Sequence, residues 1–208
     1  MLSNKCKICR RVGEKLFLKG DKCFSPKCPF LKKPSPPGIV SKKRRERISE
    51  YGRELKEAQK FKKMYGIQEK EFKRIVQGVL KKRGREDVSD LLIRDTEKKL
   101  SNIIFRTGIS KSRRGAKQLI SHGHFLLNGK EVNIPSIKVK KGDEIRIKEK
   151  SQKNSYFKSN LPLIKEDNIP SWFSFEKEKF SIKVVREPKI EEAGIKVDIP
   201  LILSFYSR

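Results

Sequence analysis

The sequence lacks several features that mark whole classes of protein. Its 208 residues contain no apolar run of the roughly 18 residues that a membrane-spanning helix needs, and no visible secretory signal. They also contain no Gly-rich phosphate loop, no nucleophile elbow and no evident acid–base pair. We therefore expect a soluble, cytoplasmic protein that has no catalytic residue, no membrane partner and no small-molecule substrate.

Acidic residues are scarce relative to basic ones. The chain has 25 Asp and Glu against 52 Lys and Arg, which gives a net charge of +27 and a pI near 10.1. Most of the excess lies in two separated blocks, residues 1–45 (14 basic, 2 acidic) and residues 98–150 (14 basic, 4 acidic). Charge that served only solubility would be spread more evenly. The two blocks therefore predict a protein that binds nucleic acid through more than one surface.

Cysteine is confined to the amino-terminal block. Cys6 and Cys9 form a C-x₂-C pair, Cys23 and Cys28 form a C-x₄-C pair, and thirteen residues separate the pairs. Two close pairs let four thiolates converge on one Zn²⁺, which predicts a structural zinc site. The alternatives are an iron–sulfur cluster, two disulfides or four free thiols. Without metal we expect this arm to be disordered, because it has few apolar residues.

Basic side chains surround these cysteines and continue beyond the stiff Pro34–Gly38 linker. We expect this arm to contact a polyanion through Lys7, Arg10, Arg11, Lys22, Lys27, Lys42, Lys43, Arg44, Arg45 and Arg47.

The second basic block opens with a predicted helix over Lys111–His122. Ser110 or Ser112 is a suitable N-cap for this helix, and Gly123 is a suitable C-terminal stop. The apolar residues lie on one face, so the cations on the other face should be exposed. A phosphate could be held by the helix terminus and a guanidinium together. The only two histidines follow without a metal-site partner, so we expect a helix-end cation or an RNA contact from them. The predicted RNA contacts here are Lys111, Ser112, Arg113, Arg114, Lys117, Gln118, His122, His124, Asn128 and Lys130.

Short strands should follow this helix. Asn128-Gly129 is the pair that a type I′ turn requires, so residues 125–127 and 131–134 are predicted to form a hairpin. A second strand pair is expected around Lys141–Asp143. The alternative interpretation is that the lysines of this small module form only a solvated face.

Apolar periodicity predicts three more helices. They run from Arg47 to Tyr65 with Gly66 as the stop, through residues 72–80, and from about Ser89 to Arg106. The aromatic cluster at residues 169–173 is expected to pack against the helices of residues 46–97, with base stacking as the alternative.

Taken together, the motifs resemble the S-four family of bacterial small-subunit ribosomal proteins over essentially the whole chain. The matching elements, in order, are Cys6-x₂-Cys9, Leu16-Phe-Leu-Lys-Gly20, Cys23-x-Ser-Pro-Lys-Cys28, Pro36-Pro-Gly38, Tyr65-Gly66-Ile67, Ser112-Arg-Arg114, His122-Gly-His124, Asn128-Gly129, Ile134-Pro-Ser136, Gly142-Asp-Glu144 and Phe205-Tyr-Ser-Arg208.

The resemblance implies an α+β fold with a zinc-bound arm (residues 1–45), a discontinuous, mainly helical domain (46–95 plus 175–208) and an inserted small α/β RNA-binding domain with short antiparallel strands (96–174, core 98–150). It also implies a structural protein that binds a multi-helix junction in the 5′ region of small-subunit rRNA, nucleates assembly and contributes to translational accuracy. The implied neighbours are ribosomal proteins three and five, and mRNA near its entry path. The alternative is an RNA-modifying enzyme or a ribosome-associated factor that carries the same RNA-binding motif.

One departure from the family concerns the cationic helix. Gly115 stands where the family often has Gln. Glycine within a helix costs ~1 kcal/mol relative to alanine. We therefore expect this helix to be frayed unless RNA supports it.

Overall fold

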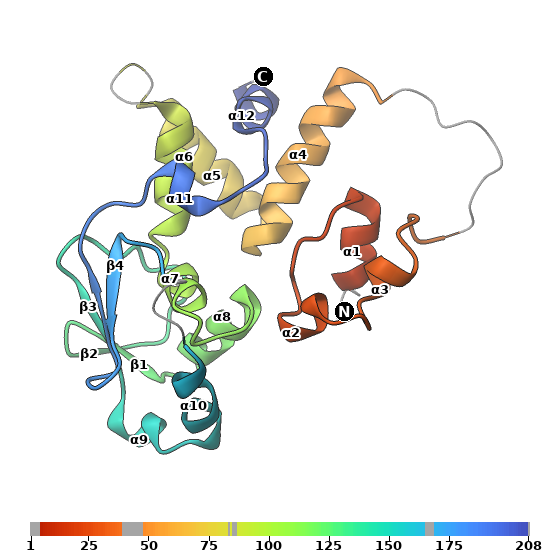
Figure 1. Cartoon of the computed structure of the whole chain (residues 1–208). Helices are drawn as coiled ribbons and strands as arrows, with labels where there is room; N and C mark the ends of the chain where they lie inside the picture. Colours follow the sequence, from red (N-terminus) through yellow and green to blue (C-terminus); the bar gives the residue numbers. More distant parts are fainter. Residues whose placement is uncertain (1–4, 39–47, 83, 85–86, 165–168, 208) are drawn as a thin grey trace. The chain divides into compact units, whose positions relative to one another are not determined.

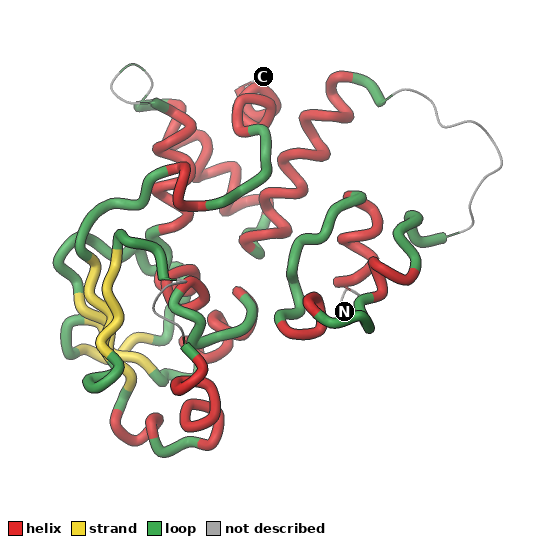
Figure 2. Tube along the Cα trace, viewed as in Figure 1, coloured by secondary structure: helices red, strands yellow, loops and turns green. Residues whose placement is uncertain are grey.

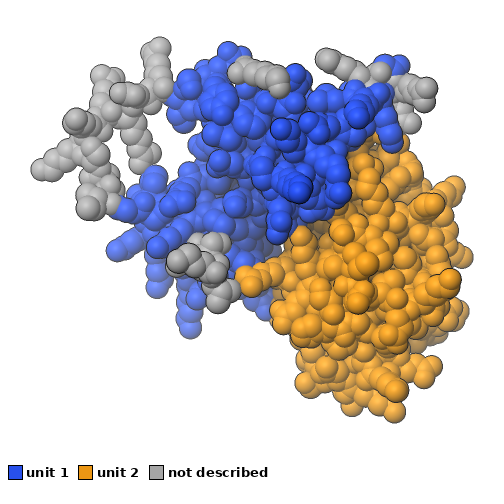
Figure 3. Space-filling model, turned by 180° about the vertical axis from the view of Figure 1, so that it is seen from behind, with its two compact units in different colours: residues 1–89, 196–208 blue, residues 90–195 orange. Residues whose placement is uncertain are grey.

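The computed structural model describes residues 5–38, 48–82, 84, 87–164 and 169–207. The chain forms two compact units, one of residues 1–89 with 196–208 and one of residues 90–195, each drawn in its own colour in Figure 3. All strands of the described chain lie in the second unit (Figure 2). The structure is thus α+β, as predicted, while the predicted three-part domain division stays a prediction.

In the first unit, helices α4, α5 and α12 pack together through aromatic rings. Helix α12 lies against α4 and α5 (Figure 1). The Phe72 ring centroid lies 5.3 Å from that of Phe61 on α4 and 5.3 Å from that of Tyr206 on α12. This unit contains α1 (Lys5–Val12), α2 (Asp21–Phe24), α3 (Pro29–Lys32), α4 (Glu50–Tyr65), α5 (Glu69–Leu80) and α12 (Ile199–Ser207).

The predicted end of α4 is confirmed. Gly66 follows Tyr65 in the left-handed conformation, with φ of 63°, and its N–H donates to the carbonyl of Lys62. At the other end, the Ser49 hydroxyl accepts a hydrogen bond from the Gly52 N–H at 3.2 Å. The helix therefore begins and ends where its capping residues direct.

The second unit is built on one antiparallel sheet with the strand order β2-β1-β3-β5-β4. Its strands are β1 (Phe125–Leu127), β2 (Lys130–Val132), β3 (Glu144–Ile147), β4 (Phe173–Glu176) and β5 (Ser181–Val184). The helices are α6 (Val88–Glu97), whose first two residues belong to the first unit, α7 (Leu100–Arg106), α8 (Arg113–Ser121), α9 (Glu149–Gln152), α10 (Ser155–Asn160), the 3₁₀ turn η1 (Leu161–Leu163) and α11 (Ile190–Ala193). The sheet thus extends beyond residue 174, where the predicted inserted domain ended.

The predicted hairpin is confirmed. Strand β1 pairs with β2 so that Leu127 lies opposite Lys130. Asn128 and Gly129 between them have φ of 49° and 79°, the positive values that a type I′ turn needs.

The predicted strand pair around Lys141–Asp143 is wrong. Strand β3 instead pairs with β1 and with β5, which is distant in sequence. The Val139 N–H donates to the carbonyl of Lys98 at 2.9 Å, so the segment before the turn has another partner.

The predicted single helix over residues 89–106 is also wrong. It is broken between Glu97 and Leu100, where Lys99 is extended, with ψ of 133°. Lys99 forms an isolated bridge with Lys138, and the Leu100 N–H donates to the carbonyl of Ile137 at 2.8 Å. A pairing between distant segments therefore overrides the local helical periodicity.

A single apolar cluster fills the second unit. Trp172 and Phe173 belong to this cluster together with Ile104, Ile120 and Phe125. The prediction that they pack against the helices of residues 46–97 is therefore wrong, because sheet residues and α7 and α8 bury them instead. None of the helices described is both long and apolar enough to cross a membrane.

Candidate nucleic-acid interface

Helix α8 presents the second basic block. Its N-cap is Ser112, whose hydroxyl accepts a hydrogen bond from the Gly115 N–H at 3.1 Å. Ala116 and Ile120 are fully buried in the apolar cluster, which fixes the face that the helix turns inward. Arg114 and Gln118 are exposed on the other side. The result is a capped helix whose first turn offers backbone N–H groups beside a guanidinium.

Arg113 is held by its own unit. Its Nε donates to Oδ1 of Asn102 at 2.9 Å, and its guanidinium carbon lies 4.4 Å from the centre of the Phe105 ring. The side chain is half-buried. Of the two neighbouring arginines, Arg114 is therefore the one whose side chain extends into solvent.

A buried polar network lies behind Arg113. Glu97 is only 1% exposed, and Arg106 donates to its two oxygens at 3.1 and 2.7 Å. The Asn102 amide donates to the same carboxylate, and Arg106 also donates to the carbonyl of Ala193 at 2.6 Å. These bonds tie α6, α7, α8 and α11 together.

Sequence reasoning missed this network. The apolar pattern of residues 89–106 predicts one helix and assigns no role to Glu97, Asn102 or Arg106. The only local signal is the i,i+4 spacing of Asn102 and Arg106. These residues set the position of Arg113, so they belong to the candidate interface although they lie beneath it.

The two histidines differ. His122 is exposed at the C-cap of α8, whereas His124 is half-buried, with Nδ1 3.0 Å from the Ser151 hydroxyl and its ring edge-on to Phe157. Burial lowers the pKa of His124 below the usual value of 6.5, and the charges of His122 and Lys148 lower it further. His124 is therefore neutral at pH 7 and does not supply the cation expected at the helix end.

The lowered pKa of His124 makes stability depend on pH. Below pH 6.5 the unfolded chain takes up a proton on this ring that the folded chain resists, so stability is complete above the unfolded pKa and falls as the pH drops through it. Between about pH 7.5 and 5.5, the free energy of unfolding of the wild type should fall more than that of a His124→Gln variant. Urea denaturation measures both, and equal losses would contradict the assignment.

Asn128 is used inside the fold. Its amide nitrogen donates to Asp143 and its amide oxygen accepts from the Glu144 N–H, both at 2.9 Å. These bonds hold the hairpin turn to the loop before β3. Among the remaining predicted contacts, Lys111 and Lys130 are exposed and Lys117 is half-buried.

The amino-terminal arm does not contain the predicted metal site. The described residues include no group of three or more His, Cys, Asp or Glu side chains placed to hold a metal ion. The prediction of zinc, with an iron–sulfur cluster as its alternative, is therefore wrong. Cys6, Cys9, Cys23 and Cys28 are thiols that line a small cavity with Leu18 and Phe30.

The cysteines behave as small apolar side chains. All but Cys6 are buried, and burial raises the pKa of the Cys9 thiol, which favours its uncharged form. The Lys19 N–H donates to the sulfur of Cys23 at 3.3 Å. The arm has three helices and buried residues, so the expectation that it needs metal to fold is withdrawn with the metal site.

As in α8, some of the predicted RNA contacts of the arm bind within the fold and others are exposed. Arg10 donates to the carbonyls of Ser35 at 2.7 Å and Pro36 at 3.4 Å, and so holds the loop that follows α3. The exposed cations of the arm are Lys7, Arg11, Lys22 and Lys27. Lys42, Lys43, Arg44, Arg45 and Arg47 lie outside the described residues.

Comparison with known proteins assigns the chain to a family. Residues 1–93 match the Ribosomal protein S4/S9 N-terminal domain, and residues 98–145 match the S4 domain. The small ribosomal subunit protein uS4 is 39% identical in Thermus thermophilus, 40% in Thermosipho melanesiensis and 41% in Fervidobacterium nodosum, with 98% of this chain and 96% of each relative covered. The chain belongs to the uS4 family.

Membership of the uS4 family confirms the resemblance drawn from the sequence motifs. The family is one of small-subunit ribosomal proteins, so the expected location, the ribosome of the cytoplasm, is confirmed as well. The S4 domain match ends at residue 145, within β3, and contains α8 and the β1–β2 hairpin.

Gly115, the departure from the uS4 family pattern, has a structural reason. A Cβ atom at this position would lie 2.5 Å from the hydroxyl of Ser110. Ser110 is 1% exposed, and its hydroxyl donates to the carbonyl of Ser112 at 3.0 Å. The glycine thus makes room for a buried hydroxyl next to the helix cap, and α8 is regular from Arg113 to Ser121.

This packing reverses the usual expectation for a helical glycine. Gly115→Ala should not give the gain of ~1 kcal/mol that helix propensity predicts, because the methyl group must displace the Ser110 hydroxyl. In a Ser110→Ala background the same change should stabilise the unit by about 0.5–1 kcal/mol. Denaturation of the wild type and the three variants yields the coupling between the two sites. Equal effects in both backgrounds would show that the hydroxyl is not the obstacle.

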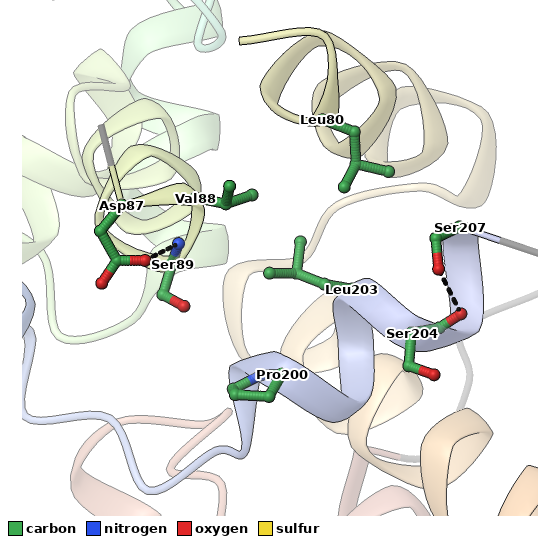
Figure 4. Close-up of a pocket in the computed structure, with 8 residues that line it drawn as sticks. All are labelled: Leu80, Asp87, Val88, Ser89, Pro200, Leu203, Ser204 and Ser207. Carbon is green, nitrogen blue, oxygen red and sulfur yellow. Dashed lines mark hydrogen bonds between the residues drawn. The ribbon is translucent and has the colours of Figure 1, made fainter. Parts of the chain in front are cut away.

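The first unit of this uS4-family chain also contains an open cavity of about 420 Å³ between α12, the end of α5 and residues 87–89 (Figure 4). Leu80, Val88 and Leu203 supply its apolar wall. Its Asp87 accepts a hydrogen bond from the Ser89 N–H at 2.9 Å, and its Ser207 hydroxyl donates to the carbonyl of Ser204. These polar groups form hydrogen bonds at the ends of α6 and α12.

Proposed function

We propose that this uS4-family chain is a structural, non-catalytic component of the small ribosomal subunit that binds its rRNA with two basic surfaces. The first, the arm surface, consists of Lys7, Arg11, Lys22 and Lys27. The second, the α8 surface, consists of Arg114, Gln118 and the first-turn N–H groups of α8. Both surfaces suit phosphate oxygens.

The observation that carries this proposal is the way α8 is supported. A capped helix, a guanidinium aligned by Asn102 and Phe105, and a buried carboxylate behind them form a rigid frame for a cationic surface. Rigid placement matters because RNA helices are recognised mainly through shape and backbone contacts. Salt-dependent phosphate contacts then supply most of the affinity.

The finer parts of the proposal concern the place of binding. We propose a multi-helix junction in the 5′ region of the rRNA as the target, early binding that nucleates assembly, and a contribution to translational accuracy. Ribosomal proteins three and five and the entering mRNA are the proposed neighbours. The family to which the chain belongs supports these proposals.

Sucrose-gradient fractionation of cells that express a tagged chain tests the main proposal. The chain should sediment with small subunits in about one copy per subunit and stay there at moderate salt. A chain that remained at the top of the gradient, or left the subunits as readily as a loosely bound factor, would contradict a structural role. Footprinting on purified small-subunit rRNA then tests the junction.

A further inference from the structure

Two aromatic rings are exposed next to each other in the arm. Phe24 is 73% exposed and Phe17 is 42% exposed, although phenylalanine is usually buried. Their ring centres are 4.9 Å apart and the ring planes differ by 29°, so the rings are stacked. The two rings together form what we call the Phe17–Phe24 platform: Phe17 lies in the segment between α1 and α2, and Phe24 is the last residue of α2.

The platform is held by buried neighbours. Leu16 and Cys23, each next to one of the rings in sequence, are 4% and 6% exposed. The Cys23 N–H donates to the carbonyl of Gly20 at 2.7 Å, and its sulfur accepts from the Lys19 N–H. The rings are therefore attached to a folded frame. Their exposure does not result from a lack of structure around them.

Phe17 adopts an uncommon backbone conformation. Its φ is 50°, in the left-handed region that bulky residues rarely enter. A bulky residue in this region costs conformational energy, and such residues gather at ligand-binding sites. The chain therefore accepts strain at the residue that turns an aromatic ring toward solvent and onto Phe24.

The surroundings of the platform are cationic. The Lys15 ammonium lies 5.3 Å from the centre of the Phe17 ring. Lys19, Lys22 and Lys27 are exposed along the same segment, which has Asp21 as its one acidic residue. Exposed rings among lysines combine a stacking surface for bases with positive charge for the backbone that connects them.

We propose that the Phe17–Phe24 platform stacks an unpaired nucleobase of RNA, while the adjoining lysines hold its phosphates. This inference rests on the proposed rRNA-binding function and adds a specificity to it. The phosphate contacts of the arm tolerate any RNA helix, whereas a stacking platform requires a base that is not paired. The arm thus selects a bulge, loop or junction over continuous duplex.

Two substitutions at Phe24 separate stacking from bulk. Phe24→Leu keeps an apolar side chain and removes the aromatic face, whereas Phe24→Tyr keeps the face. Leu31→Ala is the matched control, because Leu31 is an exposed apolar residue of the same arm, 56% exposed, outside the platform. The full chain is used throughout, and circular dichroism checks that each variant folds.

Dissociation constants are measured for an oligouridylate and for a duplex RNA of the same length, by filter binding over a range of salt. Phe24→Leu should weaken oligouridylate binding about 5- to 100-fold, the loss expected for one stacked base. The slope of affinity against salt should stay unchanged, because no cation is removed. Phe24→Tyr and Leu31→Ala should bind like the wild type.

Three results would overturn the platform. Phe24→Leu could bind oligouridylate as tightly as the wild type, or lose the same factor on duplex RNA, or lose no more than Leu31→Ala. The last two would indicate a general apolar surface, such as one that contacts a neighbouring protein. Each leaves the gradient test of the proposed function unaffected, and a chain that failed that test could still lose oligouridylate binding on Phe24→Leu.

Discussion

Replacing Glu97 with alanine should lower the free energy of unfolding of the second unit by about 3–5 kcal/mol, the cost of breaking a buried ion pair. The carboxylate is 1% exposed and accepts hydrogen bonds from Arg106 and Asn102. Its removal leaves a guanidinium with 18% exposure beside an empty position. Arg106 then lacks the charge that balances it in a place that water reaches poorly.

Urea denaturation of the full chain, followed by the fluorescence of Trp172, measures this loss, because that tryptophan is the only one in the chain and lies in the core of the second unit. Glu187→Ala is the matched control. Glu187 also binds an arginine, Arg94, at 3.1 Å, but its side chain is 46% exposed. An exposed pair should contribute about 0–1 kcal/mol. A comparable loss in both variants would show that burial of Glu97 is unimportant.

Arg114→Ala should weaken binding to the 5′ region of small-subunit rRNA about tenfold, the value of one charge-assisted hydrogen bond. The slope of log affinity against log salt should fall by about 0.9, because one phosphate contact is lost. The effect should be nearly the same on RNA of different sequences, since phosphates carry no sequence information. Stability should not change, because Arg114 is exposed.

Arg113→Ala tests whether Arg113 stabilises the second unit as well as contributing to RNA binding. Because Arg113 binds Asn102 and covers the Phe105 ring, its loss should lower the stability of the second unit as well as RNA affinity. Lys179→Ala is the matched control for charge, since its side chain is 70% exposed in the turn between β4 and β5. If Lys179→Ala reduced the salt slope as much as Arg114→Ala, the α8 surface would have no special role.

Local signals predicted the parts of the fold that residues close in sequence determine. Asn128-Gly129 specified its turn because both residues accept positive φ. Ser110 and Ser112 were both candidates for the N-cap of a helix starting at Lys111, and the structure uses Ser112, whose hydroxyl reaches the Gly115 N–H, so that α8 starts at Arg113. Family membership followed from ordered motifs. The strand β5 was not predicted, since its partner β3 lies about 40 residues earlier in the chain.

The errors at the candidate sites have a common cause. The cysteine spacing predicted a metal site, but spacing alone does not fix where thiols point, and three of the four are buried as apolar side chains. The sequence predicts both Arg113 and Arg114 as RNA contacts, and only the positions of Asn102 and Phe105 show that Arg113 is engaged inside its unit. Neither fact could be obtained from residue order, because each depends on neighbours that tertiary packing brings together.

The strand order has a consequence for synthesis of the chain. Strand β3 needs β5 as its neighbour, so the sheet that carries the β1–β2 hairpin stays incomplete until residue 184 has left the ribosomal exit tunnel. Helix α12 follows the other described helices in the sequence and packs against α4 and α5, so the Phe72 ring gains its contact with Tyr206 later still. Both units therefore complete their packing only after these late segments have been synthesised. Termination after residue 80 but before α12 would release a basic fragment in which the Phe72 ring lacks its contact with Tyr206.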